Sequence, residues 1–401
     1  MNIQRTGSTL TPSLSQSTQK QTVAQSPAHI EASVLQSILS KVADAFEPQA
    51  KTLTSPGFRQ GEDVPGAYYR KVVSGSSDQN QSISATVTLP RFQADPNRMF
   101  DNGELAQTGP LDKPSVYLGS HASTKIDKTK VEAEADIGLQ WTRRFDKNGF
   151  PTFVSPEVQN SGKPPTNEQL YSLGKDNVLR NQKGEEFKGD AKKMVPHFAF
   201  TPFARVDEPL LDAKGKPTVD AKTGKLQKKN EYLQLDQRTE QSRYFYAGEK
   251  VHMSVERTPG STKDNVTFSV QREGQAAKKY PFTSNVLGRN EASVSLKRVA
   301  SIDQFTVQTE NGVKKRVGVE STQAKQVEAT AASLSGMTWE RVEVKDRKGK
   351  SQPMTGKNFT QLYGRDAKQQ PVNEAKTFHV SGYTSAGGER MDITPTLGSK
   401  R

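Results

Sequence analysis

The feature that most constrains the fold is a period of two in the hydrophobicity of residues 131–141, VEAEADIGLQW. Apolar side chains occupy every second position from Val131 to Trp141, and carboxylates, Gly or Gln stand between them. Because successive side chains of a strand point to opposite faces, this pattern predicts a β-strand with one buried face and one acidic face. The functional question is whether these carboxylates form a catalytic row, a ligand site or a solvated surface.

Short segments with the same alternation recur along the chain, and turn-forming Gly, Asn, Asp and Pro residues separate them. Many short alternating strands bounded by such turns are typical of an all-β sandwich or barrel. The clearest segments are SISATVTLP, VHMSVE, VTFSVQ, ASVSLKRV and FTVQTENG.

An Asp-x-x-Gly pattern recurs at 146–149, 212–215 and 346–349. Asp opens such a turn and Gly accepts the positive φ before the returning strand, so the pattern predicts hairpins. These segments are too short, and carry too few carboxylates, to be calcium loops of the EF-hand kind.

The N-terminal part does not follow the period of two. Residues 1–27 are rich in Ser, Thr and Gln and contain no Asp or Glu, which predicts a disordered leader. This composition resembles the secretion signals of bacterial type III effectors, and equally the polar leaders of some myxobacterial proteins. In residues 28–47, apolar side chains recur at a spacing of four from Ile30 to Val42, which predicts one amphipathic helix.

We assign residues 60–335 to a β-sandwich. A long basic insertion at about 160–230 interrupts it, because that stretch is rich in Lys, Gly and Pro and has little periodicity. Residues 336–401 form a last β-rich portion. This portion either completes the sandwich or forms a small accessory unit, and the sequence leaves both alternatives open.

Charge and composition bound the partners. The chain has 57 Lys and Arg against 44 Asp and Glu, a net charge of +13, which favours acidic partners such as anionic glycans or a cell surface. It has no Cys, so disulfides, thiolate zinc sites and a cysteine nucleophile are excluded. No stretch reaches the roughly 18 to 20 apolar residues of a transmembrane helix. The N-terminus also lacks the apolar core of a secretory signal.

Three segments, EADIGLQW, YFYAGEKVHMSVE and SLKRVASIDQF, resemble in their order the strand signatures of concanavalin-A-like β-sandwich proteins. The resemblance covers about residues 65–310, with interruptions. It implies an all-β jelly roll of the kind found in bacterial secreted and surface proteins. Two groups of enzymes in this superfamily are therefore alternatives to a binding function.

Retaining laminarinase-type glycosidases carry Glu-x-Asp-x-Glu on one strand, so that a nucleophile and an acid/base flank the sugar bond about 5 to 5.5 Å apart. Read from Glu134, the pattern continues with Asp136 and ends on Gly138. Read from Glu132, it gives three carboxylates with the order changed and a shorter last one. Because a glycine cannot protonate a leaving group, we assign no catalytic residue to this strand.

Alginate-lyase jelly rolls often carry Tyr-Phe-Lys-x-Gly on a concave strand, and this chain has YFYAG at 244–248. Tyr246 stands where that family has lysine, and no Gln-Ile-His segment is present to neutralise a uronate carboxylate. A lyase must stabilise an enolate and remove a proton, so both departures count against this activity. Tyr244 and Tyr246 share a face and are predicted either to stack on a sugar ring or to be buried in the second sheet.

The sequence indicates no cofactor and no metal. Its five His residues lack HExxH or i, i+4 spacing, and no phosphate loop, G-x-S-x-G elbow or dinucleotide fingerprint occurs. No helix-turn-helix, RNA-recognition or zinc-finger pattern accompanies the positive charge, so we do not expect nucleic acid as a partner. The dispersed Lys pairs are either solvated decoration of turns or an organised surface for anions.

We expect a non-catalytic bacterial surface, coat (for example spore coat) or secreted protein that binds a polysaccharide or a cell-surface partner. The alternatives are a laminarinase-like or alginate-lyase-like polysaccharide-cleaving enzyme, and an effector delivered by specialised secretion. We expect an extracellular or cell-surface location without a cleaved signal peptide, with the cytoplasm as the alternative. The candidate ligand-binding residues are Glu132, Glu134, Asp136, Gln140, Tyr244 and Tyr246.

Overall fold

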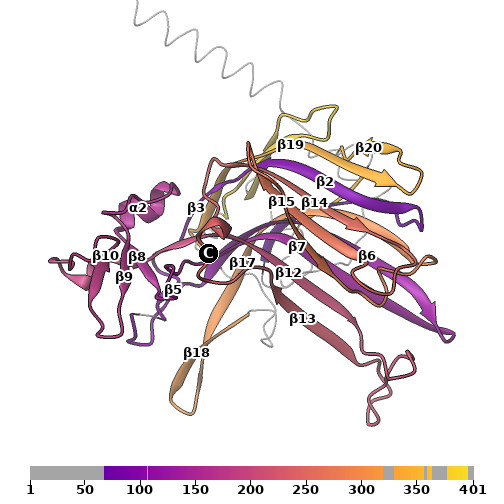
Figure 1. Cartoon of the computed structure of the whole chain (residues 1–401), viewed down its shortest axis with the longest axis horizontal. Helices are drawn as coiled ribbons and strands as arrows, with labels where there is room; N and C mark the ends of the chain where they lie inside the picture. Colours follow the sequence, from indigo (N-terminus) through magenta and orange to yellow (C-terminus); the bar gives the residue numbers. More distant parts are fainter. Residues whose placement is uncertain (1–66, 106, 319–328, 356–358, 364–376, 396–401) are drawn as a thin grey trace, which may run out of the picture. The chain divides into compact units, whose positions relative to one another are not determined.

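The computed structural model describes residues 67–105, 107–318, 329–355, 359–363 and 377–395, and all of them belong to one compact unit, Thr52–Arg401. Regular structure in these residues is almost entirely antiparallel β-sheet, which confirms the predicted all-β class (Figure 1). The predicted leader 1–27 and helix 28–47 lie outside the described residues. Among the described residues, no helix has the length and apolar character that crossing a membrane requires.

Eight strands form the first sheet: β1 (Ala67–Val73), β6 (Asp112–Ile126), β7 (Thr129–Arg143), β12 (Phe198–Pro209), β13 (Lys228–Gln234), β17 (Ser293–Glu310), β18 (Val313–Gly318) and β21 (Thr360–Tyr363). Hydrogen bonds join them in the order β13-β12-β7-β6-β17-β1-β21, and β18 pairs with the end of β17. The acidic strand β7 is therefore central in this sheet, with β6 on one side and β12 on the other.

Nine strands form the second sheet: β2 (Asn80–Thr88), β3 (Arg91–Gln93), β14 (Lys250–Arg257), β15 (Val266–Arg272), β16 (Lys278–Phe282), β19 (Ser333–Asp346), β20 (Ser351–Pro353), β22 (Phe378–Ser381) and β23 (Glu389–Ile393). Its main order is β16-β15-β14-β2-β19-β23-β22, with β3 and β20 pairing with β19. Because β19 pairs directly with β2, the C-terminal strands continue this sheet.

Smaller elements decorate the two sheets. A four-stranded sheet has the order β10-β9-β8-β11, and β4 pairs with β5. The bounds are β4 (Met99–Phe100), β5 (Gly109–Pro110), β8 (Thr152–Val154), α2 (Pro156–Ser161), β9 (Tyr171–Leu173), β10 (Leu179–Asn181), η2 (Ala191–Lys193), β11 (Val195–Pro196) and η3 (Gln241–Arg243).

The predicted insertion at about 160–230 is too broad, because it contains β12, an interior strand of the first sheet. This strand is buried on both faces from Phe198 to Ala204. A strand that is buried on both sides loses the alternation by which strands are recognised. The predicted hairpin turn at 212–217 could have revealed β12, because such a turn requires a strand on each side.

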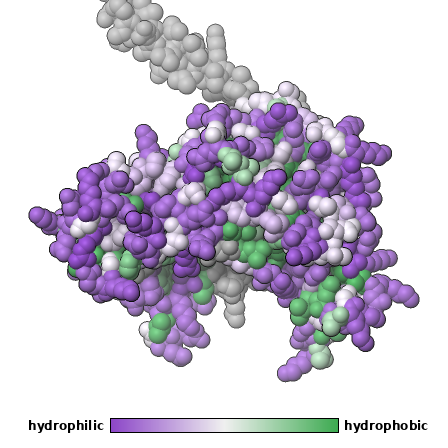
Figure 2. Space-filling view, viewed as in Figure 1, coloured by the Kyte–Doolittle hydropathy of each residue, from purple (hydrophilic) through white to green (hydrophobic). Residues whose placement is uncertain are grey.

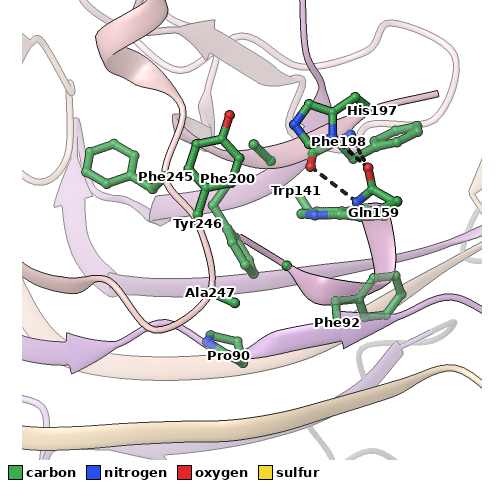
Figure 3. A pocket seen from close by; sticks show the side chains of 12 residues that line it. Pro90, Phe92, Trp141, Gln159, His197, Phe198, Phe200, Phe245, Tyr246 and Ala247 are labelled. Carbon is green, nitrogen blue, oxygen red and sulfur yellow. Dashed lines mark hydrogen bonds between the residues drawn. The ribbon is translucent and has the colours of Figure 1, made fainter. Parts of the chain in front are cut away.

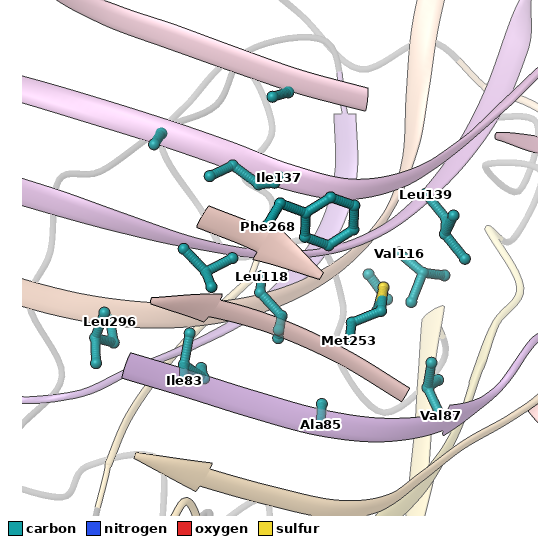
Figure 4. Packing of buried hydrophobic residues seen from close by; sticks show 14 of the residues in the cluster. Ile83, Ala85, Val87, Val116, Leu118, Ile137, Leu139, Met253, Phe268 and Leu296 are labelled. Atoms are coloured by element: carbon teal, nitrogen blue, oxygen red, sulfur yellow. The ribbon is translucent and has the colours of Figure 1, made fainter. Parts of the chain in front are cut away.

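The two large sheets share one apolar core, and side chains of both meet in it (Figure 4). Ile137 and Leu139 of β7 share this core with Met253 of β14 and Phe268 of β15. Burying one such side chain contributes about 1.5–3 kcal/mol. The alternation predicted for β7 is confirmed, because its buried set is Val131, Ala133, Ala135, Ile137, Leu139 and Trp141.

The three Asp-x-x-Gly turns are also confirmed. Oδ1 of Asp146 accepts hydrogen bonds from the backbone N–H groups of Asn148 and Phe150, at 2.8 and 2.9 Å. Asp212 and Asp346 accept the corresponding pairs of bonds, and the glycine of each turn has a positive φ. These aspartates thus serve local turn structure.

A buried ion cluster joins the two sheets. Glu389 of β23 lies 2.8 Å from Arg70 of β1 and 2.6 Å from Arg298 of β17, and each side chain is at most 2% exposed. Burial acts to raise the pKa of Glu389, but the guanidiniums of Arg298 and Arg70 outweigh it and hold this pKa well below its usual range. The cluster therefore requires an ionised Glu389.

Replacing Glu389 by Gln should lower the free energy of unfolding by about 3–5 kcal/mol, because two buried guanidiniums lose their counter-charge. The extra free energy of unfolding of the wild type is fully present above the pKa of a Glu in the unfolded chain, about 4.3. It is lost as the pH falls toward the lowered pKa of Glu389 in the folded protein. Chemical denaturation of both proteins at a series of pH values measures this difference.

The matched control is Glu310→Gln, which removes a carboxylate from an exposed pair with Lys315. An exposed pair contributes about 0–1 kcal/mol. Equal losses in the two variants would contradict the role assigned to the buried cluster.

Candidate functional site

The first sheet has an outer face, the face whose side chains point away from the apolar core. Gly119 of β6 and Arg205 of β12 stand on either side of Asp136 on this face. The four predicted ligand residues of β7 also lie on it, because they alternate with the buried set: Glu132, Glu134, Asp136 and Gln140.

One buried cation organises two of these carboxylates. Lys297 of β17 lies two strands from Asp136, with Gly119 between them in the ladder. Its Nζ lies 2.6 Å from Oδ1 of Asp136 and also pairs with Glu134. A Cβ at residue 119 would lie 2.7 Å from Cε of Lys297 and 2.2 Å from the carbonyl oxygen of Ala135. Glycine at this position therefore leaves the path of the lysine open.

Lys297 also fixes the charge of the site. Its side chain is only 4% exposed, and burial acts to lower its pKa, but Asp136 and Glu134 outweigh burial and raise it above the usual range. In return, the charge of Lys297 lowers the pKa of Glu134 to about 2. At neutral pH Glu134 is therefore ionised and holds no proton for a leaving group.

Gly138, which stands at the acid/base position of the glycosidase pattern, lies under two aromatic rings. Tyr117 of β6 and Phe203 of β12 flank it in the ladder, and their rings meet edge-on with centroids 5.9 Å apart. A Cβ at residue 138 would lie 2.5 Å from Cα of Tyr117. The space that a carboxylate would need is therefore occupied.

Glu132 lies apart from the Lys297 pair. Its carboxylate is 46% exposed, 2.7 Å from Nζ of Lys130 and 3.9 Å from Nε2 of His121. A hydrogen bond from Lys130 lowers the pKa of Glu132. Exposed pairs of this kind contribute about 0–1 kcal/mol. The acidic strand is thus divided into one solvated carboxylate and two that pair with one buried lysine.

Tyr232 of β13 presents an aromatic ring on the outer face. It stacks on Phe203 with centroids 6.2 Å apart and planes at 14°, and its hydroxyl donates to Oε1 of Gln140 at 3.0 Å. The residue is still 54% exposed. One ring face is therefore supported by protein, while much of the side chain remains available to a ligand.

Arg205 stands between Asp136 and Tyr232 in the ladder. Residues directly opposite each other in antiparallel strands have Cβ atoms about 4.5–5.5 Å apart, so these three side chains are immediate neighbours. Asp136 is already paired with Lys297, and in the part of the chain that the structure describes Arg205 forms no ion pair. Arg205 and the exposed Tyr232 thus share the outer face on adjacent strands.

Sequence reasoning missed both Arg205 and Tyr232, because β12 and β13 lie at the end of the predicted insertion. It also placed Tyr244 and Tyr246 among the candidates, and these are only 2% and 9% exposed. The hydroxyl of Tyr244 donates to the carbonyl of Arg238 at 2.7 Å. Both rings are buried, but in the loop before β14 and against Ala199 of the first sheet, not in the second sheet as predicted. Stacking on a sugar would require the rings to leave this packing.

Tyr246 instead lines a recess between β12, α2 and the loop before β14 (Figure 3). Burial raises the pKa of Tyr246 to about 12 and lowers the pKa of His197, which stacks on it, to about 3. Nδ1 of His197 lies 2.8 Å from Oε1 of Gln159. The free space, about 10 Å³, holds about one water molecule, which is far too little for a sugar ring.

Comparison with known proteins assigns no family. No protein-family model and no curated protein matches the chain. A solved structure of scytalido-glutamic peptidase with a transition state analog inhibitor is 10% identical with a TM-score of 0.33, covering 82% of this chain and 100% of that one. The alginate lyase from Klebsiella pneumoniae is 11% identical with a TM-score of 0.19, covering 60% of each chain. Neither likeness is high enough to carry an argument about fold or function.

Within the described ranges, no three His, Asp or Glu side chains are grouped so that they could hold a metal ion. The carboxylates of β7 are the nearest candidates, and two of them already pair with Lys297. A divalent cation would have to displace the lysine.

Replacing Lys297 by Met should raise the pKa of Glu134 from about 2 to its usual range or above, because the variant removes the charge that lowers it. An NMR titration of the Glu134 carboxyl carbon in both proteins measures the change. An unchanged midpoint would mean that Lys297 does not control the carboxylates.

Replacing Gly119 by Ala should cost about 1–3 kcal/mol of unfolding free energy, because the new Cβ overlaps the lysine and the β7 backbone. The control is Gly75→Ala, where a Cβ would have no heavy atom within 4 Å. Equal melting temperatures for the two variants would contradict the proposed path of Lys297.

Proposed function

We propose that this protein binds an acidic polysaccharide without cleaving it, through the outer face of the first sheet around Tyr232 and Arg205. The observation that carries the proposal is the exposed ring of Tyr232 on the same face as Arg205, which stands opposite it in the ladder and forms no ion pair among the described residues. The proposal includes the concanavalin-A-like assignment and a location at a bacterial surface, in a coat or outside the cell.

The chemistry of an acidic sugar fits these two side chains. The apolar face of a pyranose ring packs on an aromatic ring, which is large, rigid and already supported by Phe203. A uronate carboxylate accepts two parallel hydrogen bonds from a guanidinium, which Arg205 supplies. Gln140 lies beside Tyr232 and offers amide groups to the hydroxyls of the sugar.

The surrounding charge supports an anionic ligand. The arm between β12 and β13, residues 210–227, projects from the first sheet, and the surface in the same view is largely hydrophilic (Figures 1 and 2). A net charge of +13 raises the rate of encounter with a polyanion, and this contribution is screened by salt. Three lysines on the arm form no ion pair among the described residues: Lys214, Lys222 and Lys225. Lys216, Lys228 and Lys229 pair with Asp127, Asp207 and Glu231.

The charge state of the carboxylates supports binding without cleavage. A retaining glycosidase needs one protonated carboxyl group near neutral pH, and such a group has a raised pKa. The pKa of Glu134 is instead lowered to about 2, and Asp136 is paired with the same lysine. Both remain acceptors for sugar hydroxyls, which is the role that we assign to them.

Tyr232→Ala and Arg205→Gln should each weaken binding to alginate or polygalacturonate by about tenfold, because each removes a main contact. Affinity electrophoresis or calorimetry with the full chain measures the loss. Raising the salt from about 0.05 to 0.5 M should weaken wild-type binding as well. Tyr232→Phe, which keeps the ring, should retain more affinity than Tyr232→Ala.

Lys222→Gln is the matched control, because it removes an exposed charge from the tip of the same arm. An equal loss of affinity in Lys222→Gln and Arg205→Gln would mean that binding depends on the overall charge and not on a site at Arg205. Wild-type binding to neutral dextran as tight as to alginate would contradict the acidic specificity. Release of reducing sugar or unsaturated product, abolished by Glu134→Gln with Asp136→Asn, would establish the polysaccharide-cleaving alternative instead.

A further inference from the structure

A second cationic cluster lies at the far end of β17, where the strand continues into its hairpin with β18. Nζ of Lys113 on β6 lies 5.1 Å from the centroid of the Phe305 ring, and Cζ of Arg316 on β18 lies 5.5 Å from the same centroid. Phe305 and Val307 share a face of β17, and Arg316 stands opposite Val307. Two cationic side chains thus contact one aromatic ring.

Neither cation has a counter-ion among the described residues. Lys113 stands opposite Asp303 in the ladder but forms no ion pair with it. The Asp303 carboxylate accepts hydrogen bonds from the hydroxyls of Ser115 and Ser301, at 2.6 and 2.9 Å. In the part of the chain that the structure describes, Lys113 and Arg316 also make no side-chain hydrogen bond. Two cations over one ring therefore lack an anionic partner among the described residues.

This arrangement lowers the pKa of Lys113. Burial, and then the charges of Arg316 on β18 and Arg143 on β7, lower the pKa of Lys113 to about 7, against the opposing effect of Asp303 on β17. An ordinary lysine titrates near 10.4. A nearby anion would reverse this shift, because it favours the charged form of the lysine.

We propose that Lys113 and Arg316 form a binding site for an oxyanion of the sulfate type, which rests against the edge of the Phe305 ring. A tetrahedral oxyanion has several acceptor oxygens, so it can take hydrogen bonds from an ammonium and a guanidinium at once. The anion is either free in solution or carried as a sulfate ester on a polymer. This site is separate from Tyr232 and Arg205 and does not depend on the function proposed for them.

Binding at this site is linked to protonation of Lys113. Only the ammonium form attracts the anion, so affinity is fully present below about pH 7 and falls as the pH rises through that value. Arg316 and Arg143 stay charged throughout this range. The proton taken up on binding therefore belongs to Lys113.

The test is an NMR titration of the lysine side chains in the full-length protein, with the Lys113 signal assigned by its loss in Lys113→Arg. In chloride, the midpoint of Lys113 should lie near pH 7. Replacing chloride by sulfate at constant ionic strength should raise this midpoint by about one unit or more, which corresponds to a tenfold preference for the charged form. An unmoved midpoint would overturn the proposal, since an anion at this site must affect Lys113.

Two matched variants distinguish specific binding of sulfate from a general effect of salt. Arg316→Gln should abolish the effect of sulfate, whereas Lys315→Gln, on the opposite face of the same hairpin, should leave it intact. Equal effects in both variants would also overturn the proposal. A sulfated hexasaccharide then identifies the source: affinity reduced about tenfold by Arg316→Gln indicates a polymer-borne sulfate, and unchanged affinity indicates the free ion.

Discussion

The outer face is organised around the buried charge of Lys297. Lys297 crosses the strand that carries Gly119 and pairs with two carboxylates of β7, which stabilise its ammonium in the interior. The lysine and the carboxylates therefore fix one another in place and in charge. This coupling converts a row that resembles a catalytic strand into a rigid set of hydrogen-bond acceptors, and it leaves Arg205 without an acidic partner among the described residues.

The two faces of the first sheet have different roles. Its inner face is apolar and packs on the second sheet, and the buried cluster of Glu389 with Arg70 and Arg298 adds a polar tie between the sheets. Its outer face combines fixed charges with the aromatic rings of Tyr117, Phe203 and Tyr232. A rigid scaffold beneath an exposed ring reduces the entropy that a ligand must overcome, which suits recognition of a flexible polymer.

Local patterns were sufficient for part of this structure. The alternation of β7 and the Asp-x-x-Gly turns depend on neighbours in sequence, and both were predicted correctly. The state of Glu134 was not predictable, because its partner Lys297 is 163 residues away and reaches it only through the strand order. Arg205 was missed because burial on both faces hid most of β12, and Tyr232 was missed because β13 begins inside the predicted insertion. The aromatic pair 244 and 246 was overvalued because sequence does not reveal burial in a loop.

The most direct test of the account is to map where a polyuronate oligosaccharide contacts the wild-type protein by NMR. The account predicts that the ring signals of Tyr232, the side-chain N–H of Arg205 and the side-chain amide of Gln140 shift together with one saturating affinity. Shifts confined to the recess around Tyr246 and His197, or spread evenly over the surface lysines, would contradict it. In either case the outer face of the first sheet would not be the binding surface.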